Sequence, residues 1–341
     1  MLEIDGSYGE GGGSIIRTSI GLAAATGRAV RVFHIRKGRN SPGLKEQHLQ
    51  GIRAVADFCN GKLKGDELGS SEIVFEPGSE FLDRVKIRIE TAGSVGLALQ
   101  PLMIAAVGAK KEIEADVRGG ATYGKWAPPI DFVGGVFSPI LKKMGYAAEF
   151  GVEQHGFYPT GGARVNVVLQ PPKEGLKGLN LIEQGRIESV KGISVASEHL
   201  QKQKVAERQK ISARQEIFKE LKVSSNIKTS YPRTESIGSA ITLSLTTQKS
   251  GILGASAIGE KNLRAEMVGK QASQSLIQDF QAGATIDRHS LDQIIPFLVL
   301  SQFSSSLKFA ELTAHAHTNI WVSEQFFGKT LEISGKTLLK T

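Results

Sequence analysis

The chain has a single cysteine, Cys59, among its 341 residues. One thiol excludes an internal disulfide and a zinc site built from cysteines. Long hydrophobic runs are also missing, since the longest, residues 97–109, is interrupted by Gln100 and is too short to span a bilayer. The first residues include Glu3 and Asp5 and lack the basic region of a secretory signal. We therefore expect a cytoplasmic protein that has no membrane partner.

Two familiar nucleotide-binding signatures are absent from the glycine-rich segment near the N-terminus. Residues 8–13 read YGEGGG, with no GK[ST] after the glycines and no GxGxxG spacing. Glycines still let backbone amides approach an anion closely, and a helix expected from Ser14 would add unpaired N–H groups. Glu10 puts a carboxylate where phosphates would sit, which a divalent cation would reconcile. The alternative is a glycine-rich turn with a solvated glutamate, which this segment taken alone favours.

Acidic residues are fewer than basic ones, which gives a net charge of +8 and a pI of about 9.4. Clustered Lys and Arg gain affinity for polyanions by releasing counterions, so RNA or DNA is the first partner to consider. Residues 201–222 contribute seven Lys or Arg against three Glu. This predicted helix has two interpretations, a solvated outer face or an RNA contact.

The order of predicted elements repeats along the chain. Ser14 and Ser94 begin corresponding helices, and the pattern around them indicates a duplicated βαβαββ unit with a third copy at the end. The predicted elements are a helix from 14, strand 29–35, helix 42–58 and strands 62–68 and 72–75; then strand 84–90, helix 94–107, strand 111–117, helix 128–144 and strands 147–153 and 163–169; and finally helix 291–303, strand 308–314, helix 319–327 and strand 330–333.

A segment of different character separates the second copy from the third. Residues 184–282 contain a predicted strand at 187–195, a helix at 201–221, three further strands and a helix at 265–280. These elements are enough for a small α/β domain of its own.

Two arginines precede another predicted helix start. The segment IRKGRNSPGLKEQHL places Arg36 and Arg39 before Pro42, with Gln47 and His48 following in the helix. Guanidinium groups on such a turn can grip a phosphate through paired hydrogen bonds. Surface arginines beside a loop are the alternative, and the YGEGGG segment favours the phosphate interpretation.

Two histidines stand near the C-terminus in ELTAHAHTNIWV. We expect His315 and His317 at the end of a strand, where alternation would point both to one face, with Thr318 and Asn319 capping the next helix. The chemistry would be an HxH metal pair or one histidine acting as nucleophile or base. A metal pair lacks further ligands, because the other histidines are scattered and HExxH is absent.

Taken together, the motifs resemble those of the RNA 3′-terminal phosphate cyclase family. They are YGEGGG with SIIRTS, IRKGRNSPGLKEQHL, TAGSVGLALQ, APPIDF, HGFYPTGG and HAHTN, in that order. The resemblance implies an α+β fold of three βαβαββ units, like the C-terminal domain of a translation initiation factor, with a small thioredoxin-like insert. Residues 1–184 and 281–341 would form the large catalytic domain, and residues 185–280 the inserted domain.

The resemblance also implies an activity and its residues. The family converts an RNA 3′-phosphate into a 2′,3′-cyclic phosphodiester with ATP, through a histidine–AMP intermediate and an RNA-adenylate, and the nucleophile matches His315. Glu10 matches a ligand of a divalent metal, Mg²⁺ or Mn²⁺. Phosphate contacts match Arg17, Arg36, Arg39 and Gln47, and positions around the adenylate match Gln100, Pro128, Phe132, His289, Asp292 and Gln293.

Three features depart from the family pattern or remain open. His317 stands where an apolar residue is usual, and YPRTESIGSAITL, from Tyr231, lacks the usual proline–glycine turn. Trp126 would either stack on a base or fill a hydrophobic gap. The resemblance leaves a homodimer open.

Rival interpretations lie both inside and outside the superfamily. Cyclase-like ribosome-assembly proteins share the scaffold, bind RNA and protein, and lack the nucleophile, so His315 and Glu10 favour the enzyme. An enolpyruvyl transferase would lack such an insert, and a plain RNA-binding module would leave HAHTN without a role.

Overall fold

The computed structural model describes residues 1–341, and the first four-stranded sheet lies next to the N-terminus. Its strand order is β1-β2-β4-β3, with β1 parallel to β2 and the other pairs antiparallel. The alternation of Val30 and Val32 turns one face into the core. Helices α1 and α2 connect these strands. The bounds are β1 Leu2–Asp5, α1 Gly13–Thr26, β2 Val30–Phe33, α2 Glu46–Phe58, β3 Lys62–Lys64 and β4 Ile73–Glu76.

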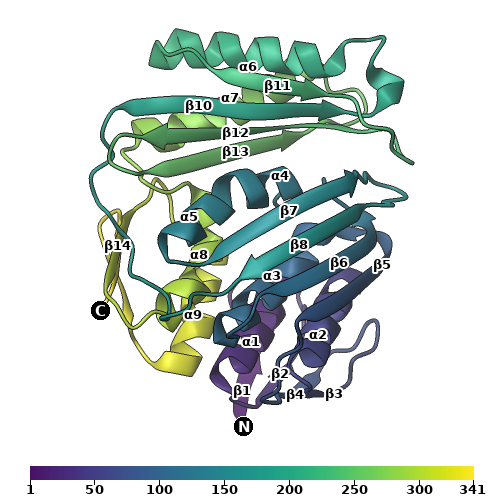
Figure 1. Ribbon diagram of the computed structural model, residues 1–341, viewed down its shortest axis with the longest axis vertical. Coiled ribbons are helices and arrows are strands. Elements are labelled where there is room, and N and C mark those ends of the chain that lie inside the picture. Colours follow the sequence, from purple (N-terminus) through teal and green to yellow (C-terminus); the bar gives the residue numbers. More distant parts are fainter.

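Two further sheets follow the same order of first, second, fourth and third strand. They are β5-β6-β8-β7 and β9-β14-β16-β15. Figure 1 shows the first of them beside α3, with the C-terminal elements at the opposite side. The bounds are β5 Arg84–Ser94, α3 Val95–Ala105, β6 Ile113–Ala121, α4 Ile130–Phe132, the π-helical turn Val133–Phe137, α5 Ser138–Lys143, β7 Ala147–Gln154, β8 Arg164–Gln170, β9 Asn180–Leu181, α8 Arg288–Leu300, β14 Ser305–Lys308, α9 Ala314–Phe327, β15 Leu331–Ser334 and β16 Thr337–Lys340.

A fourth sheet, β11-β10-β12-β13, stands apart at one end of the molecule, at the top of Figure 1. Helices α6 and α7 cover its outer face, and Gly254 on the other face packs against Val136 and Phe132. A separate cluster of buried apolar side chains holds it together. The bounds are β10 Ile187–Ala196, α6 Val205–Leu221, β11 Asn226–Ser230, β12 Ser239–Thr247, β13 Ile252–Ile258 and α7 Ala265–Gln281.

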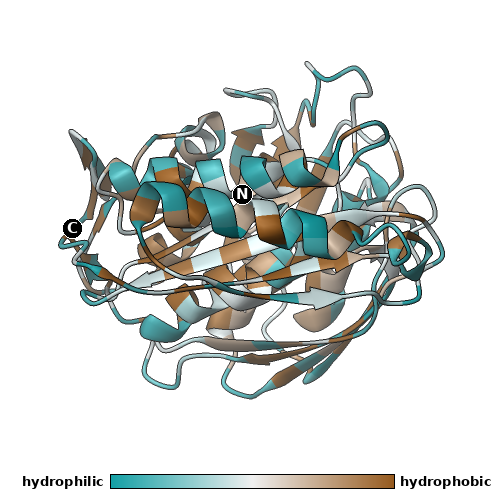
Figure 2. Ribbon diagram, turned by 90° about the horizontal axis from the view of Figure 1, so that it is seen from above, coloured by the Kyte–Doolittle hydropathy of each residue, from teal (hydrophilic) through white to brown (hydrophobic).

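The basic helix α6 lies on the surface. Seen from above in Figure 2, the outer helices carry mostly hydrophilic residues toward the viewer. Only Ala206, Gln209, Ala213 and Ile217 of this helix are buried. Most of its Lys and Arg side chains are therefore on a face open to solvent.

Helices α1 and α3 approach each other closely in the large core. Gly21 makes this approach, because a Cβ there would lie 2.7 Å from Ile104 Cβ and 2.9 Å from the Pro101 carbonyl oxygen. Burying Ile20 and Leu22 alongside contributes about 1.5–3 kcal/mol for each side chain. This packing holds the C-terminal halves of the two helices together, and the Arg17–Gln100 hydrogen bond joins them one turn closer to their N-termini. No helix is both long and apolar enough to cross a membrane.

Most predicted elements are present, but several limits differ. The sequence reading missed the short strands β1, β9 and β16, and it began α2 at 42 instead of Glu46. The predicted helix 128–144 is interrupted by a π-helical turn at Val133–Phe137. The predicted strand 308–314 ends as β14 at Lys308. Short strands of four residues or fewer give too little periodicity to be recognised without their sheet partners.

Candidate active site

A cavity of about 450 Å³ opens where the large core meets the fourth sheet. Its walls come from α1, α3, the segment 125–132, β13, α8 and α9. Eight of the predicted site residues line it: Arg17, Gln100, Pro128, Phe132, His289, Asp292, Gln293 and His315. Four others, Glu10, Arg36, Arg39 and Gln47, lie outside this lining.

His315 is bonded to the glycine-rich loop. Its Nδ1 lies 2.7 Å from Glu10 Oε1, and Arg39 Nη2 lies 3.3 Å from Glu10 Oε2. Burial opposes ionisation of Glu10, but the hydrogen bond from His315 and the charges of His315 and Arg39 outweigh it and hold the pKa of Glu10 below its ordinary value. The Nδ1 bond to a carboxylate fixes the ring and leaves Nε2 available.

The loop itself is pressed against α9. The ring of Tyr8 stacks on Trp321 with centroids 3.9 Å apart. Gly9 and Gly11 have φ values of +58° and +55°, and a Cβ on Gly9 would lie 3.0 Å from Thr318 Oγ1. Glycine is favoured here because an L side chain rarely adopts this backbone conformation.

Arg17 is buried, with 6% of its surface exposed. Its Nε donates to Gln100 Oε1 at 2.7 Å. Burial is the main reason that the pKa of Arg17 falls to about 10, with Glu10 acting in the opposite direction and Arg36 in the same one. A guanidinium that is this desolvated, and still charged at neutral pH, is a strong binding group for an anion entering the cavity.

The starts of α1 and α3 lie beside Arg17 and Gln47. No side chain caps α1 after Gly12, whereas Ser94 caps α3 by accepting from the Leu97 N–H at 3.2 Å. Gln47 Oε1 accepts from the Ser94 N–H at 2.7 Å. The uncapped start of α1 leaves N–H groups free for an anion, and the structure engages Gln47 in holding the start of α3.

His48 and Arg36 lie close to Arg17 and the start of α1. A Cβ on Gly13 would lie 2.2 Å from His48 Nε2, so only glycine fits beside this buried ring. Burial, followed by the charges of Arg17 and Arg36, holds the pKa of His48 well below its ordinary value. Arg36 Nη1 donates to the carbonyl oxygens of Ser41 and Gly43, at 2.6 and 2.9 Å, and so closes its own loop.

Asp292 connects α8 with the start of α9. Thr313 Oγ1 donates to Asp292 Oδ1 and accepts from the Ala316 N–H at 3.0 Å, which makes Thr313 the N-cap of α9. The Asn319 amide donates to the Asp292 carbonyl oxygen at 2.7 Å. Burial is the main cause that raises the pKa of Asp292 to about 7, against the bond from Thr313.

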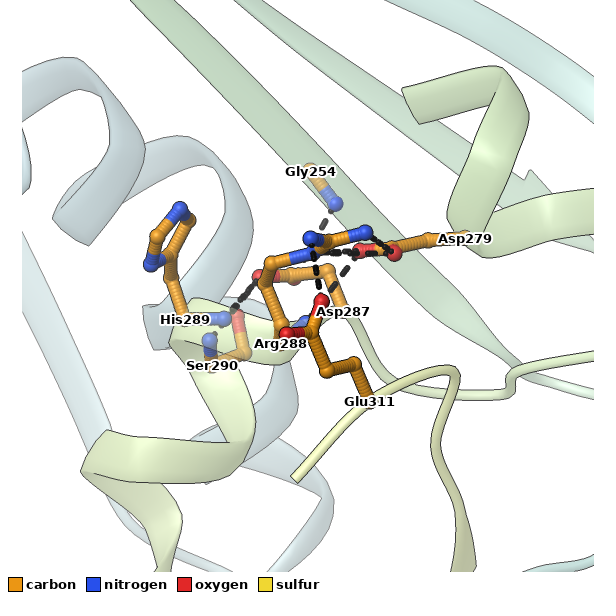
Figure 3. A network of polar contacts seen from close by, with 7 residues as sticks. All are labelled: Gly254, Asp279, Asp287, Arg288, His289, Ser290 and Glu311. Carbon is orange, nitrogen blue, oxygen red and sulfur yellow. Dashed lines mark hydrogen bonds and ion pairs between the residues drawn. The ribbon is translucent and has the colours of Figure 1, made fainter. Parts of the chain in front are cut away.

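A second polar network joins α8 to the fourth-sheet region (Figure 3). Asp287 caps α8 by accepting from the N–H groups of His289 and Ser290, and its other oxygen accepts from the Gly254 N–H at 3.0 Å. Arg288 bridges Asp279 of α7, at 2.6 Å, and Glu311, at 2.7 Å. The network therefore fixes the end of α8 that carries His289 into the cavity.

A model of the RNA 3′-terminal phosphate cyclase family matches residues 8–333. The chain belongs to this family. It is 42% identical to the RNA 3′-terminal phosphate cyclase of Methanopyrus kandleri, over 98% of this chain and 96% of that protein. The identity to the protein of the same name from Pyrococcus furiosus is 42% over the same shares, and to that from Methanosarcina barkeri 40%, over 98% of this chain and 97% of that protein. The similarity to the cyclase family thus includes the fourth-sheet region.

The prediction that His315 and His317 lie at the end of a strand was wrong. His315 and His317 lie in the first turns of α9, not at the end of a strand, because Thr313 caps a helix that begins at Ala314. Residues two positions apart in a helix point in directions about 200° apart around its axis, so the rings of His315 and His317 do not share a face. Of these two histidines, His315 lines the cavity and His317 does not. Thr318 and Asn319, expected to cap the helix, lie within it.

Sequence reasoning missed one wall of the cavity. Ser256, Ile258 and Glu260, at the end of β13, line it together with Lys125 and Trp126. No motif marked the β13 residues, and only the packing of the fourth sheet brings them to the site. We use "inner wall" for Arg17, Gln100, Phe132 and Asp292, and "rim" for Lys125, Trp126 and Glu260.

Protein ligands for a metal are sparse at this site. Nowhere in the chain do three or more His, Cys, Asp or Glu side chains gather as a metal-binding group. Glu10 lies in the loop just before the uncapped start of α1, and both its oxygens are engaged, by His315 and by Arg39. A cation here would therefore need most of its ligands from bound phosphate and water, the pattern usual for Mg²⁺.

Proposed function

We propose that this protein is an ATP-dependent RNA 3′-terminal phosphate cyclase that forms a 2′,3′-cyclic phosphodiester. The observation that carries the proposal is His315 in the cavity wall, with Nδ1 held 2.7 Å from Glu10 Oε1. Membership of the family and identities of about 40% to named cyclases support it. A non-catalytic RNA-binding scaffold would have no use for this pair.

Covalent catalysis would proceed from the free Nε2 of His315. Its lone pair attacks the α-phosphorus of ATP, a P–N bond forms, and the bond to pyrophosphate breaks, while Glu10 accepts the hydrogen bond of the increasingly positive ring. An oxygen of the RNA 3′-phosphate then displaces the imidazole and takes the AMP. The neighbouring 2′-hydroxyl loses its proton as it attacks the activated phosphorus, and AMP leaves.

Phosphate binding is assigned to the wall around the start of α1. Arg17 supplies a buried charge, and Arg39 lies beside Glu10 at the loop. Arg36 and Gln47 complete the proposed set, acting chiefly by holding the Arg39 loop and the start of α3. Mg²⁺ or Mn²⁺ bound at Glu10 would polarise the phosphoryl oxygens and neutralise part of their charge.

The adenosine part of ATP is assigned to the deeper cavity. Phe132 and Pro128 offer apolar surface for a base, and Gln100, Asp292 and Gln293 offer polar groups, with His289 on the side of α8. Apolar walls with a few fixed polar groups are the usual composition of a nucleotide pocket.

The proposal includes the internal organisation of the fold. Three βαβαββ units, in residues 1–184 and 281–341, would carry the catalytic domain, and residues 185–280 would be a thioredoxin-like insert. The shared strand order of the three sheets and the separate core of the fourth support this division. The proposed location is the cytoplasm. We also propose a homodimer, which sedimentation of the purified chain would test.

The test is covalent labelling with α-labelled ATP and a divalent metal. We expect labelled protein whose bond is acid-labile and alkali-stable, with labelling abolished in His315→Ala and retained in the matched variant His317→Ala. RNA ending in a 3′-phosphate should consume the label, and RNA ending in a 3′-hydroxyl should not. Labelling that survives His315→Ala would overturn the nucleophile, and no labelling under any condition would favour the scaffold function.

A further inference from the structure

Trp126 has the most exposed large apolar side chain in the chain, with 96% of its surface accessible. It fills no hydrophobic gap, which removes one of its two sequence-based interpretations. Its φ is +57°, a conformation rare for a bulky residue. Side chains held in such a conformation persist where the surrounding structure imposes it, and they cluster at functional sites.

The segment that carries Trp126 is tied down before and after this residue. Before it, Lys125 Nζ lies 3.1 Å from Glu260 Oε1 of the fourth-sheet region, and the ring of Tyr123 stacks on that of Phe157 with centroids 4.8 Å apart. After it, the Ile130 N–H donates to the Thr122 carbonyl oxygen at 2.9 Å, and the Thr122 N–H in turn donates to the Gly156 carbonyl oxygen at 3.0 Å. The exposed indole is thus presented by an anchored segment at the rim of the cavity.

We infer that Trp126 is the stacking platform for the base of the 3′-terminal nucleotide of the RNA. The inference rests on the proposed function, because the RNA 3′-phosphate must reach the adenylate on His315, which lines the same cavity. An aromatic face accepts any base, and the net charge of +8 suits a polyanionic strand. Stacking covers the indole surface that is otherwise in water.

The base of ATP is the alternative partner for the Trp126 ring. The difference in burial between Phe132 and Trp126 favours the RNA base at Trp126. Phe132, in the inner wall, is 1% exposed and lines the cavity together with Pro128, so the interior of the cavity already has an apolar wall for a bound nucleoside. Trp126 touches the cavity from outside and is almost entirely accessible. A ligand that arrives from solvent and ends at His315 meets Trp126 first.

Enzyme assays on Trp126→Ala and Trp126→Phe test the inference. In Trp126→Ala, transfer of AMP to a 3′-phosphorylated oligonucleotide should show a KM for RNA raised about five- to hundredfold, the cost of one lost base stack. The factor by which the rate of protein labelling by ATP changes should be at least fivefold smaller than the factor by which the KM for RNA rises. Trp126→Phe should restore the KM for RNA most of the way to that of the unaltered protein. Phe303→Ala, an exposed aromatic residue just beyond the other end of α8, is the matched control.

An oligonucleotide whose terminal nucleotide lacks its base sharpens the test. The unaltered protein should discriminate against it, and Trp126→Ala should treat both oligonucleotides alike. Equal discrimination by the two proteins would overturn the inference. A loss confined to ATP labelling would overturn it too, and would assign Trp126 to the base of ATP.

Fluorescence gives a readout that needs no catalysis. The chain has two tryptophans, so Trp321→Phe leaves Trp126 as the only reporter. RNA should quench this emission, and the oligonucleotide without the terminal base should quench it less. Failure of the proposed activity would leave this signal intact, whereas an unchanged emission at saturating RNA would refute stacking on its own.

Discussion

The inner wall of the cavity and its rim are held in place in different ways. Arg17, Gln100, Phe132 and Asp292 are buried, and the polar members are bonded to partners within the large core. Lys125, Trp126 and Glu260 are exposed and meet across the boundary with the fourth-sheet region. The inner wall therefore has the fixed geometry that the proposed covalent chemistry requires, and the proposed RNA contact falls on the exposed rim.

The largest effect is expected at Glu10, the carboxylate proposed to orient the nucleophile His315. Glu10→Gln keeps the shape of the side chain and removes the charge that stabilises the His315 ring, so the rate of labelling by ATP should fall by about 10,000-fold. Rapid-quench labelling measures this rate. Glu3→Gln, an exposed carboxylate paired with Arg31, should change it less than twofold. Equal effects in the two variants would contradict the assigned role.

The stability of the protein should depend on the contact between the start of α8 and the fourth-sheet region. Arg288→Met leaves Asp279, with 1% of its side chain exposed, without its cation, which should cost about 3–5 kcal/mol. The thermal midpoint should then fall by roughly 5–10 °C. Lys249→Met breaks the exposed Lys249–Glu183 pair and should cost less than about 1 kcal/mol. Calorimetry of the two variants tests this, and similar midpoints would mean that the Figure 3 network contributes nothing.

Asp292 of the inner wall should make the stability of the protein depend on pH. Burial raises the pKa of Asp292 from 3.8 to about 7, so its favourable contribution is complete below pH about 4 and is lost as pH rises through 7. Asp292→Asn does not titrate, and its thermal midpoint relative to the unaltered protein should rise between pH 5 and pH 8. Glu72, whose pKa is lowered by Arg31, is the opposite case, and Glu72→Gln should give a constant difference over this range.

The smallest effect is expected at the rim. Lys125→Met removes an ion pair whose side chains are about half exposed, so stability should change by less than about 1 kcal/mol. If the pair positions Trp126, the KM for RNA should rise a few-fold while labelling by ATP stays the same. Steady-state transfer assays measure this, and a loss of labelling would contradict the separation of inner wall and rim.

Three of the four residues of the inner wall, Arg17, Gln100 and Phe132, could be named from sequence because they lie in the short motifs that carry the family resemblance. APPIDF carries Pro128 and Phe132, and TAGSVGLALQ carries Gln100, each with a recognisable local pattern. Their contacts could not be named in the same way. The Arg17–Gln100 bond joins residues 83 positions apart, and it exists because Gly21 lets α1 and α3 pack closely.

The two histidines show how a local pattern can mislead. Alternating residues in HAHTN fit the end of a strand as well as the first turn of a helix, because five residues are too short to separate the two periods. Thr313 decides between them, since its side chain caps the N–H of Ala316 and also bonds Asp292 of α8. The second of these bonds needs a partner 21 residues away.

The sequence by itself determined the residue types available for chemistry, the glycine-rich approach to an anion, the excess of positive charge and the family resemblance. These depend on composition and on neighbours along the chain. Only the tertiary structure decided that His315 and not His317 faces the cavity, that Glu10 holds its ring, and that β13 and Trp126 complete the entrance. The physical reason is that burial, hydrogen-bond partners and helix packing are set by segments that meet in space after long separations in sequence.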